Sequence, residues 1–377
     1  MKPKIWLSSP HMGGKEQDFV NEAFATNWIA PLGPNVNGFE SDLQDFLNED
    51  DAHVACLNSG TSAIHLALIL AGVSNGDEVI CQSMTFSASA NPIMYQGATP
   101  VFIDSEKDTW NMCPEFLEQA ITDRISKGKT PKAIIVVHLY GMPAKMDEII
   151  TIASKYNIAL IEDSAEAIGA TYKGRKCGTF SPFGILSFNG NKMITTSSGG
   201  ALVCKEKTHK EKAVYLSTQA RDKAVHYQHS EVGYNYRMSN VTAGIGRGQM
   251  LVLQDHINLR RANNQFYQDI FKDIKGVSVF IEPHKDYVSN HWLSCVTFSK
   301  DAKITATQLR ECLDEENIES RPLWKPMHLQ PVFSDAPFYG SNISKELFLN
   351  GLCLPSGSNL TKEEKTRIKT AIFEAFK

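Results

Sequence analysis

Short apolar runs alternate with helical patterns from about residue 52 to residue 205, and this alternation is the feature that most constrains the fold. The runs are HVACLN, DEVICQ, PVFIDS, AIIVVHLYG and IALIEDS, and TSAIHLALILAGV is one of the helical segments between them. Strands that are apolar throughout are buried on both faces, which predicts a parallel sheet with helices on either side. Such sheets bind ligands at the carboxyl ends of their strands, so functional residues are expected directly after each run.

The length of the chain predicts two lobes. We expect a large domain over residues 12–250 and a smaller α+β domain over residues 251–377, with residues 1–11 packing near the smaller one. A long helical stretch over 240–271 is expected to lead from one to the other. The smaller part contains the strand-like runs VSVF and WLSCVTF, a helix near TATQLRECLDEENI and the aromatic loop RPLWKPMHLQPVF.

Composition argues against nucleic-acid and membrane partners. The formal net charge is -4 and no long basic stripe is present. No apolar run reaches the ~18 to 20 residues that a membrane helix needs, and the start MKPKIWLSSP lacks the apolar core of a secretory signal, so we expect a cytoplasmic protein. The eight cysteines never occur as CxxC and mostly lie in apolar runs, which favours reduced, packed thiols over disulfides or a zinc site.

Three strand ends carry residues that could do chemistry. Ser59-Gly60-Thr61-Ser62 opens a helix and could bind an anion, Asp163 and Glu166 follow IALIE, and Lys192 follows SFNGN. Taken singly, each has an ordinary explanation as a helix cap, a capping carboxylate or a solvated lysine. Together they match the needs of pyridoxal phosphate, which requires phosphate donors, a carboxylate for its pyridine nitrogen and a lysine for its aldehyde.

The same residues carry a family resemblance over nearly the whole chain. The motifs are SSPHMGGKE, NWIAPLGPNV, LNSGTSAIHLAL, MTFSASANPIMYQGATPVFID, HLYGMPAKMDEI, IEDSAEAIGATYKGRKCGTFSPFGILSFNGNKMITTSSGGALV, GYNYRMSNVTAGIG and RPLWKPMHLQP. In this order they resemble the DegT/DnrJ/EryC1/StrS sugar-nucleotide aminotransferases, which are pyridoxal phosphate enzymes. The implied fold is α/β of the aspartate aminotransferase type (fold type I), mainly parallel, with a smaller α+β C-terminal domain.

The resemblance implies a set of site residues. It assigns Lys192 as the catalytic lysine that bonds covalently to the cofactor, and Asp163 as the partner of the pyridine nitrogen. Phe86 would cover one face of the ring, although a core helix aromatic is the alternative interpretation. Asn235 would reach the phosphate of the neighbouring subunit, which implies a homodimer with shared active sites. The implied cofactor contacts are Gly60, Thr61, Ser62, Phe86, Asp163, Glu166, Ser187, Asn189, Lys192 and Asn235.

Glu166 departs from the wider family, because most relatives carry glutamine or histidine there and those resembling bacillosamine-pathway enzymes carry glutamate. If the Glu166 side chain approaches the ring hydroxyl oxygen of the cofactor, two anionic groups would face each other unless one carries a proton. Asn191, before the lysine, fits the same subgroup.

The implied reaction moves an amino group from L-glutamate to a keto sugar. The motifs most resemble transaminases that act at C4 of UDP-4-keto-6-deoxy-N-acetylglucosamine and serve bacillosamine-type glycans. Arg237, Trp324, Lys325 and His328 are the candidates for substrate binding, with Arg321 as a further one. Each also has a structural explanation, such as a carboxylate partner for Arg237 or a core position for Trp324.

Several alternatives stay open. The substrate could carry dTDP or GDP, or the product could have the opposite C4 stereochemistry. A related dehydratase would have histidine in place of Lys192, and a binding or regulatory protein could keep the fold without turnover. His226 and His229 could share one helical face with Glu231 nearby, but no further ligand accompanies them, so we expect no metal.

Overall fold

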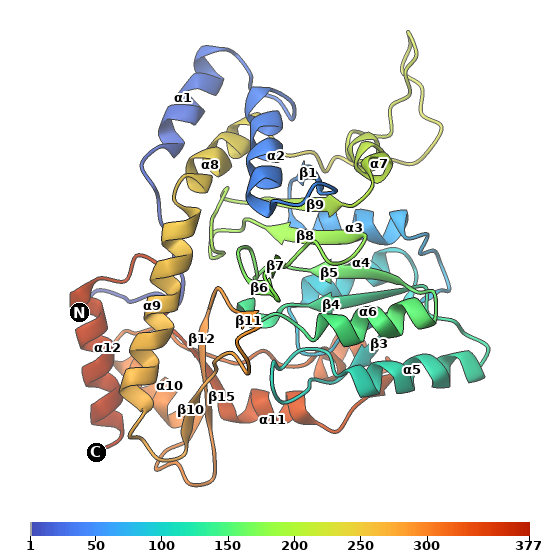
Figure 1. Ribbon diagram of the computed structural model, residues 1–377. Helices are drawn as coiled ribbons and strands as arrows, with labels where there is room; N and C mark the ends of the chain where they lie inside the picture. Colours follow the sequence, from blue (N-terminus) through green and yellow to red (C-terminus); the bar gives the residue numbers. More distant parts are fainter. Residues whose placement is uncertain (1) are drawn as a thin grey trace.

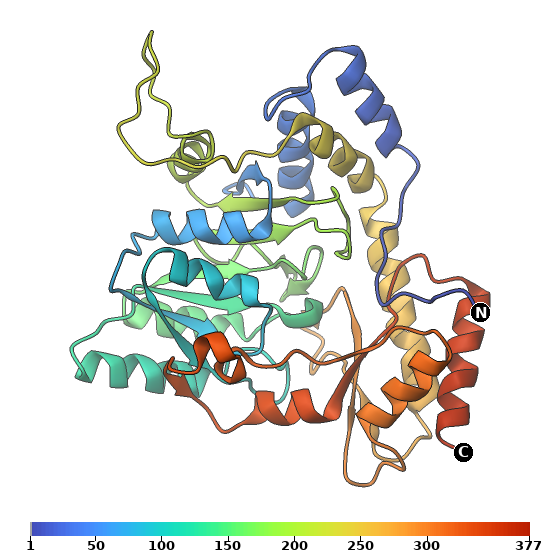
Figure 2. The same cartoon turned by 180° about the vertical axis from the view of Figure 1, so that it is seen from behind.

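The computed structural model describes residues 2–377 and is built around an eight-stranded sheet (Figures 1 and 2). From one edge to the other the strand order is β1-β9-β8-β5-β4-β2-β3-β14. Each predicted apolar run contains one of these strands, so the α/β class is confirmed. The bounds are β1 (His53–Leu57), β2 (Glu78–Gln82), β3 (Thr99–Ile103), β4 (Ala133–Val137), β5 (Ala159–Asp163), β8 (Phe183–Ser187), β9 (Gly200–Cys204) and β14 (Phe338–Tyr339).

The sheet is mainly parallel, but β9 runs antiparallel to both of its neighbours, β1 and β8. The chain returns from β8 to β9 through residues 188–199 without a crossover helix, and a direct return of this kind gives an antiparallel neighbour. Because β1 and β8 are both antiparallel to β9, they point in the same direction as each other. The carboxyl ends of β1, β2, β5 and β8 therefore meet at one edge of the sheet.

Helices cover both faces of this sheet, as the apolar strands require. In Figure 1 α5 and α6 lie in front of the sheet, and Figure 2 shows α3 and α4 on the opposite face. Successive side chains of β4 point to opposite faces of the sheet. Ile134 packs in the same cluster as Ile149 of α6, and Ile135 packs in the same cluster as Ile64 of α3. The bounds are α3 (Gly60–Leu70), α4 (Asn91–Tyr95), α5 (Pro114–Ser126), α6 (Met146–Lys155) and α7 (Lys207–Ser217).

A second, smaller lobe is formed by the four-stranded sheet β10-β12-β15-β13 with helices packed against it. Ile5 forms a parallel bridge with Ile318 and is fully buried in the core of this lobe, so the first residues of the chain run along it. The bounds are β10 (Val277–Val279), β12 (Ser294–Phe298), β13 (Arg321–Pro322), β15 (Gly351–Leu354), α9 (Leu253–Phe271), α10 (Ala306–Glu315), α11 (Ile343–Asn350) and α12 (Lys362–Ala375).

The predicted helical stretch over 240–271 is two helices, because two residues separate the end of α8 (Asn240–Met250) from the start of α9. The helices α1 (Glu16–Ala25) and α2 (Pro34–Leu47) pack on α8. A separate three-stranded sheet joins the two halves of the chain and consists of β6 (Thr171–Tyr172), β7 (Arg175–Lys176) and β11 (Tyr287–Val288).

After β13 the chain returns to the large sheet. The short helices η3 (Met327–Leu329) and η4 (Pro331–Phe333) pack on the large domain, and β14 then pairs in parallel with β3. The ring of Phe333 lies 5.3 Å from that of Phe102, measured between centroids. Residues 327–339, which we call the returning segment, follow residue 250 in sequence but pack on the large domain. The limit at residue 250 therefore remains a prediction.

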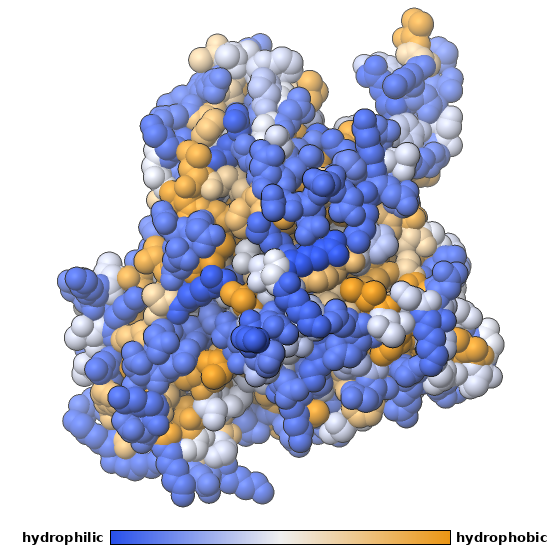
Figure 3. All heavy atoms as spheres, viewed as in Figure 1, coloured by the Kyte–Doolittle hydropathy of each residue, from blue (hydrophilic) through white to orange (hydrophobic). Residues whose placement is uncertain are grey.

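A long loop between α7 and α8 projects from the large domain (Figure 1), and Figure 3 shows that its tip is hydrophobic. Val225 and Tyr227, both in this loop, are almost fully exposed. Within residues 2–377 no helix is both long and apolar enough to cross a bilayer.

Candidate active site

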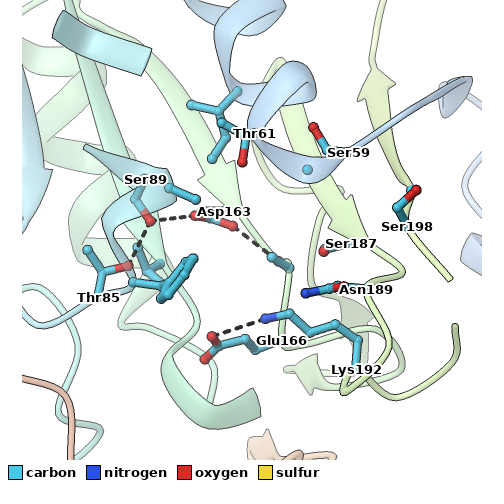
Figure 4. A pocket seen from close by; sticks show the side chains of 17 residues that line it. Ser59, Thr61, Thr85, Ser89, Asp163, Glu166, Ser187, Asn189, Lys192 and Ser198 are labelled. Carbon is cyan, nitrogen blue, oxygen red and sulfur yellow. Dashed lines mark hydrogen bonds and ion pairs between the residues drawn. The ribbon is translucent and has the colours of Figure 1, made fainter. Parts of the chain in front are cut away.

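A cavity of about 270 Å³ lies at the edge where the carboxyl ends of the strands meet (Figure 4). Its walls come from the segments that follow β1, β2, β5 and β8, and from the segment that leads into β9. Strand ends that are distant in sequence therefore supply one site, which is the location that the sheet topology favours for ligands.

One wall is the N-terminus of α3. Ser59 is the N-cap of this helix and its hydroxyl accepts a hydrogen bond from an N–H of the first turn at 3.0 Å. The remaining N–H groups of a first helical turn have no intrahelical acceptors, and the helix dipole adds partial positive charge. Thr61, Ser187 and Ser198 line the same part of the cavity, and a Cβ on Gly60 would meet the Ser187 Cβ at 3.2 Å. This wall suits a phosphate-sized anion.

A buried carboxylate, Asp163, lies at the end of β5 and faces the same cavity (Figure 4). The Ser89 hydroxyl donates to Asp163 Oδ2 at 2.6 Å, and the Ala165 N–H donates to Oδ1 at 3.2 Å. The Thr85 and Ser89 hydroxyl oxygens lie 2.7 Å apart and extend this chain of hydrogen bonds. The carboxylate is therefore held in one orientation and can accept a further bond from a cationic N–H in the cavity.

Lys192 reaches the cavity from the loop after β8, and its side chain is only 12% exposed. The Lys192 Nζ lies 3.3 Å from Glu166 Oε1 and 4.1 Å from the centre of the Trp292 ring. Trp292 belongs to the smaller lobe and its indole N–H donates to the Asn191 carbonyl at 2.8 Å. A primary amine held in this way can attack a carbonyl carbon and can carry protons.

The carboxyl of Glu166 faces Lys192 from within the protein. Its Oε2 accepts a hydrogen bond from the Tyr140 N–H at 2.7 Å, and Tyr140 has a φ of 55°, in the left-handed region that few non-glycine residues adopt. Burial raises the pKa of Glu166 to about 7, and the charge of Asp163 adds to the rise, while Lys192 and the Tyr140 N–H oppose it. The carboxyl can therefore exchange a proton near neutral pH.

A second cavity of about 310 Å³ adjoins the first and shares Phe86, Asn189 and Lys192 with it. Its other walls include Trp292 and Trp324. Phe86 is 58% exposed, which excludes the alternative that it is a core aromatic. Lys192 thus stands between two compartments, one with anion donors and the other with aromatic walls.

The fold and these two compartments define the class of protein: one that can hold an anionic cofactor against a helix N-terminus and present a buried lysine amine to a carbonyl group.

Comparison with known proteins then gives the family. Residues 10–373 match the DegT/DnrJ/EryC1/StrS aminotransferase family. The chain is 50% identical to Bacillus subtilis (strain 168) EpsN, named as a pyridoxal phosphate-dependent aminotransferase, over 100% of this chain and 97% of that one. It is 36% identical to GDP-perosamine synthase of Escherichia coli O157:H7 over 99% of this chain and 98% of that one. The chain belongs to the DegT/DnrJ/EryC1/StrS aminotransferase family.

A solved structure agrees with this. The pyridoxal phosphate form of the sugar aminotransferase Spr1654 from Streptococcus pneumoniae superposes with a TM-score of 0.88 and 25% identity over 100% of both chains. The protein is a pyridoxal phosphate-dependent sugar aminotransferase, and the cofactor and the enzyme class predicted from the sequence are confirmed.

The residues of the first cavity fit this cofactor. The α3 N-terminus and its hydroxyls can hold the phosphate, Asp163 can hold the ring nitrogen, and Lys192 can reach the aldehyde. Glycine at position 200 keeps this wall compact, because a Cβ there would lie 2.3 Å from the Gly60 nitrogen. The fit therefore depends on close backbone approach as well as on side chains.

The structure brings most of the predicted cofactor residues together around the first cavity. Two of them lie elsewhere. The Ser62 hydroxyl donates to Asn58 Oδ1 at 2.7 Å and serves the helix cap, while Ser59 takes the place facing the cavity. Asn235 is exposed outside the cavity of its own chain. Those lining the cavity are Gly60, Thr61, Phe86, Asp163, Glu166, Ser187, Asn189 and Lys192.

The predicted substrate residues divide into two groups. Trp324 lines the second cavity, and so does Arg321, which pairs with Glu319 at 2.8 Å. Arg237 does not reach either cavity, because its buried guanidinium pairs with Glu40.

His328 and Lys325 also lie outside the two cavities. The His328 Nδ1 lies 2.7 Å from the Ser83 hydroxyl, its ring stacks on Phe338 at 3.7 Å, and burial lowers its pKa. His328 therefore anchors the returning segment, and Lys325 is exposed. Both were predicted to bind substrate, and neither side chain lines either cavity of its own chain.

Sequence reasoning missed Ser89 and Trp292. Ser89 lies in TFSASAN, directly after β2, and a small polar residue at a strand end was the available signal. No local sequence signal pointed to Trp292, because its hydrogen-bond partner, Asn191, is 101 residues away in the chain. Within residues 2–377, no three His, Cys, Asp or Glu side chains are grouped so that they could hold a metal ion.

Proposed function

We propose that the enzyme transfers the amino group of L-glutamate to C4 of a nucleotide-linked 4-keto-6-deoxy sugar, with UDP-4-keto-6-deoxy-N-acetylglucosamine as the substrate and bacillosamine-type glycans as the destination. The observation that carries the proposal is the place of Lys192, whose amine borders both the anion-lined cavity and the aromatic one. A cofactor in the first compartment and a sugar in the second would meet at this amine.

The cofactor, when bound, supplies an electrophilic carbon and a ring that withdraws electrons from it. Asp163, fixed by Ser89, holds a proton on the ring nitrogen. Lys192 would take a proton from the amino donor and deliver it to a different atom, which is the proton movement that each half-reaction of a transamination requires. Glu166 lies 3.3 Å from Lys192 Nζ, so it can accept the proton that leaves the lysine neutral.

The second cavity favours a deoxy sugar attached to a charged group. Trp292, Trp324 and Phe86 offer flat apolar surfaces for a sugar ring and its methyl group, and Arg321 supplies a cation for a diphosphate. The relative that is named for a GDP-linked sugar is 36% identical, so the nucleotide is the part of the proposal that most needs a direct test.

The test has two stages. Addition of L-glutamate to the holoenzyme should bleach the visible band of the cofactor, and borohydride reduction followed by peptide mapping should place the label on Lys192. UDP-, GDP- and dTDP-linked 4-keto-6-deoxy sugars are then offered, and NMR gives the position and configuration of the new amine. Amination of the UDP sugar at C4 with at least roughly tenfold higher kcat/KM supports the proposal. Preference for another nucleotide, or binding without bleaching, refutes it.

We further propose that the enzyme works as a homodimer with shared sites. Asn235 and the projecting loop are exposed, and Phe86, Met94 and Tyr95 expose large apolar surfaces on the same domain. Exposed apolar area of this extent favours burial against another protein. In a dimer, Asn235 would extend into the neighbouring subunit's cofactor site.

Mixing two inactive variants tests this arrangement. Lys192→Ala and Asn235→Ala dimers are each expected to be impaired, yet a mixed dimer would contain one site with both native residues. Recovery of up to a quarter of wild-type activity after subunit exchange is the expected result for random pairing, because half of the dimers are mixed and each has one intact site. No recovery in dimers shown by mass spectrometry to be mixed would contradict the shared site.

A further inference from the structure

Two cysteines face each other in the sheet of the smaller lobe. Cys295 of β12 is the direct cross-strand partner of Cys353 of β15, and their sulfur atoms lie 3.7 Å apart. Both are free thiols and both are buried. Cys353 lines the second cavity, next to Trp292 and Leu293.

The register of the strands makes this a pair without backbone hydrogen bonds between its members. The Cys295 carbonyl accepts from the Phe280 N–H at 2.8 Å, on the side of β10. The Leu323 N–H donates to Gly351 O at 3.3 Å, so Gly351 and the residue two further on, Cys353, point their backbone groups toward β13. The N–H and C=O of each cysteine are thus directed away from the other cysteine.

This geometry suits a covalent bond between the two side chains. In antiparallel sheets the Cα atoms of a pair without mutual hydrogen bonds are about 4.5 Å apart, and their side chains approach most closely. Disulfides accept Cα separations of roughly 4.4 to 6.8 Å, so no strand has to move far for the sulfurs to join.

We propose that Cys295 and Cys353 are a modification site, a dithiol that a peroxide entering the second cavity oxidises to an intramolecular disulfide. Hydrogen peroxide first transfers one oxygen to Cys353, which becomes a sulfenic acid while one water is released. The Cys295 sulfur then attacks the Cys353 sulfur, the S–S bond forms, and the hydroxyl leaves as a second water with the Cys295 proton. Two thiols are oxidised by two electrons and one peroxide is reduced.

The order of the steps follows from the surroundings. Cys353 borders the cavity, whereas Cys295 does not, and burial together with the neighbouring thiol raises the pKa of Cys295. The first oxidation therefore falls on Cys353, and Cys295 acts as the resolving thiol.

Peptide mapping of the holoenzyme tests the proposal without reference to activity. After treatment with hydrogen peroxide, the free thiols are blocked in denaturant and the protein is digested without reductant. A peptide pair linked through Cys295 and Cys353 and a drop from eight to six titratable thiols, both reversed by dithiothreitol, are expected. The oxidised protein should also melt at a higher temperature, because the bond closes a loop between residues 58 apart.

Cys353→Ser and Cys295→Ser serve as matched controls, and each should lose the linked peptide. If either variant fails to fold, the wild-type map alone still decides, since it identifies the linked residues directly. Eight intact thiols after oxidation, or a disulfide that joins any other pair, would overturn the proposal.

Discussion

The carboxyl of Glu166 makes the stability of this enzyme depend on pH in a way that can be calculated. Burial raises its pKa to about 7 in the folded protein, whereas a glutamate in an unfolded chain titrates near 4.5. Between these values the folded state holds a proton that the unfolded state has released. Stability from this group is therefore fully present below about pH 4.5 and falls as the pH rises toward 7.

The linkage relation gives the size of the effect. Integrating from pH 5 to pH 8 with these two pKa values, Glu166 should lower the free energy of unfolding by about 2 to 3 kcal/mol, of a possible total of about 3 kcal/mol. Glu166→Gln removes the titration but keeps an oxygen for the Tyr140 N–H and nearly the same volume. The attraction of Lys192 for the ionised carboxyl is already contained in the pKa of about 7, so the difference in slope between the two proteins reports on the titration of Glu166.

The assay is urea denaturation of the cofactor-free protein at pH 5, 6, 7 and 8, for wild type, Glu166→Gln and the exposed control Glu22→Gln. The difference in free energy of unfolding between wild type and Glu166→Gln should change by about 2 to 3 kcal/mol across this range, in favour of the variant at high pH. The control should follow wild type. If the Glu166→Gln curve also stays parallel to wild type, the carboxyl is not titrating in this window and the reasoning is refuted.

Five further variants separate effects on catalysis from effects on stability. Asp163→Asn should keep the fold, measured by circular dichroism, and slow the glutamate half-reaction, followed by stopped-flow absorbance, on the order of 100-fold, because the neutral amide cannot stabilise a cationic ring nitrogen. Arg237→Met should lower the free energy of unfolding by about 2 kcal/mol, since it leaves the buried Glu40 carboxylate with only Lys210 and the Cys56 N–H as partners, and leave the KM for the sugar nucleotide unchanged. Arg321→Met should raise the KM for the sugar nucleotide and leave the free energy of unfolding nearly unchanged. Equal effects of the two arginine variants on KM would contradict the assignment of the second cavity. Trp292→Leu should slow the same half-reaction roughly tenfold and Trp292→Phe less, because only the latter keeps a ring beside Lys192 Nζ.

Much of the site could be predicted because its residues directly follow strands that the apolar runs reveal. Asp163 and Lys192 each lie at or just after the end of such a run. The carboxyl ends of parallel strands lie at one edge of the sheet, so this edge brings the two side chains together. The direction of β9 was less visible, because an apolar run looks the same in a parallel and an antiparallel neighbour. Its position between β1 and β8 became evident only from the pairing.

The predicted substrate residues Arg237 and His328 lie outside the two cavities for a common reason, which is a partner remote in sequence. The partner of Arg237 is 197 residues away and that of His328 is 245 residues away, so no local pattern could show that these side chains are already engaged. Ser62 lies outside the cavity for a local reason. In a run of hydroxyl residues at a helix start, the helical rotation decides which hydroxyls face outward and which complete the cap.

The strand β14 has a consequence for how the molecule can be cut. It covers β3, and Asp104, just beyond β3, accepts hydrogen bonds from the N–H groups of Ser341, Ile343 and Ser344. A fragment that stops at residue 320 would leave that sheet edge bare, with the Phe102 ring stripped of its neighbour Phe333. The large sheet therefore depends on residues that follow the smaller lobe in sequence. A stable truncated protein, or a chimaera with an exchanged lobe, has to include the chain at least as far as Ser344.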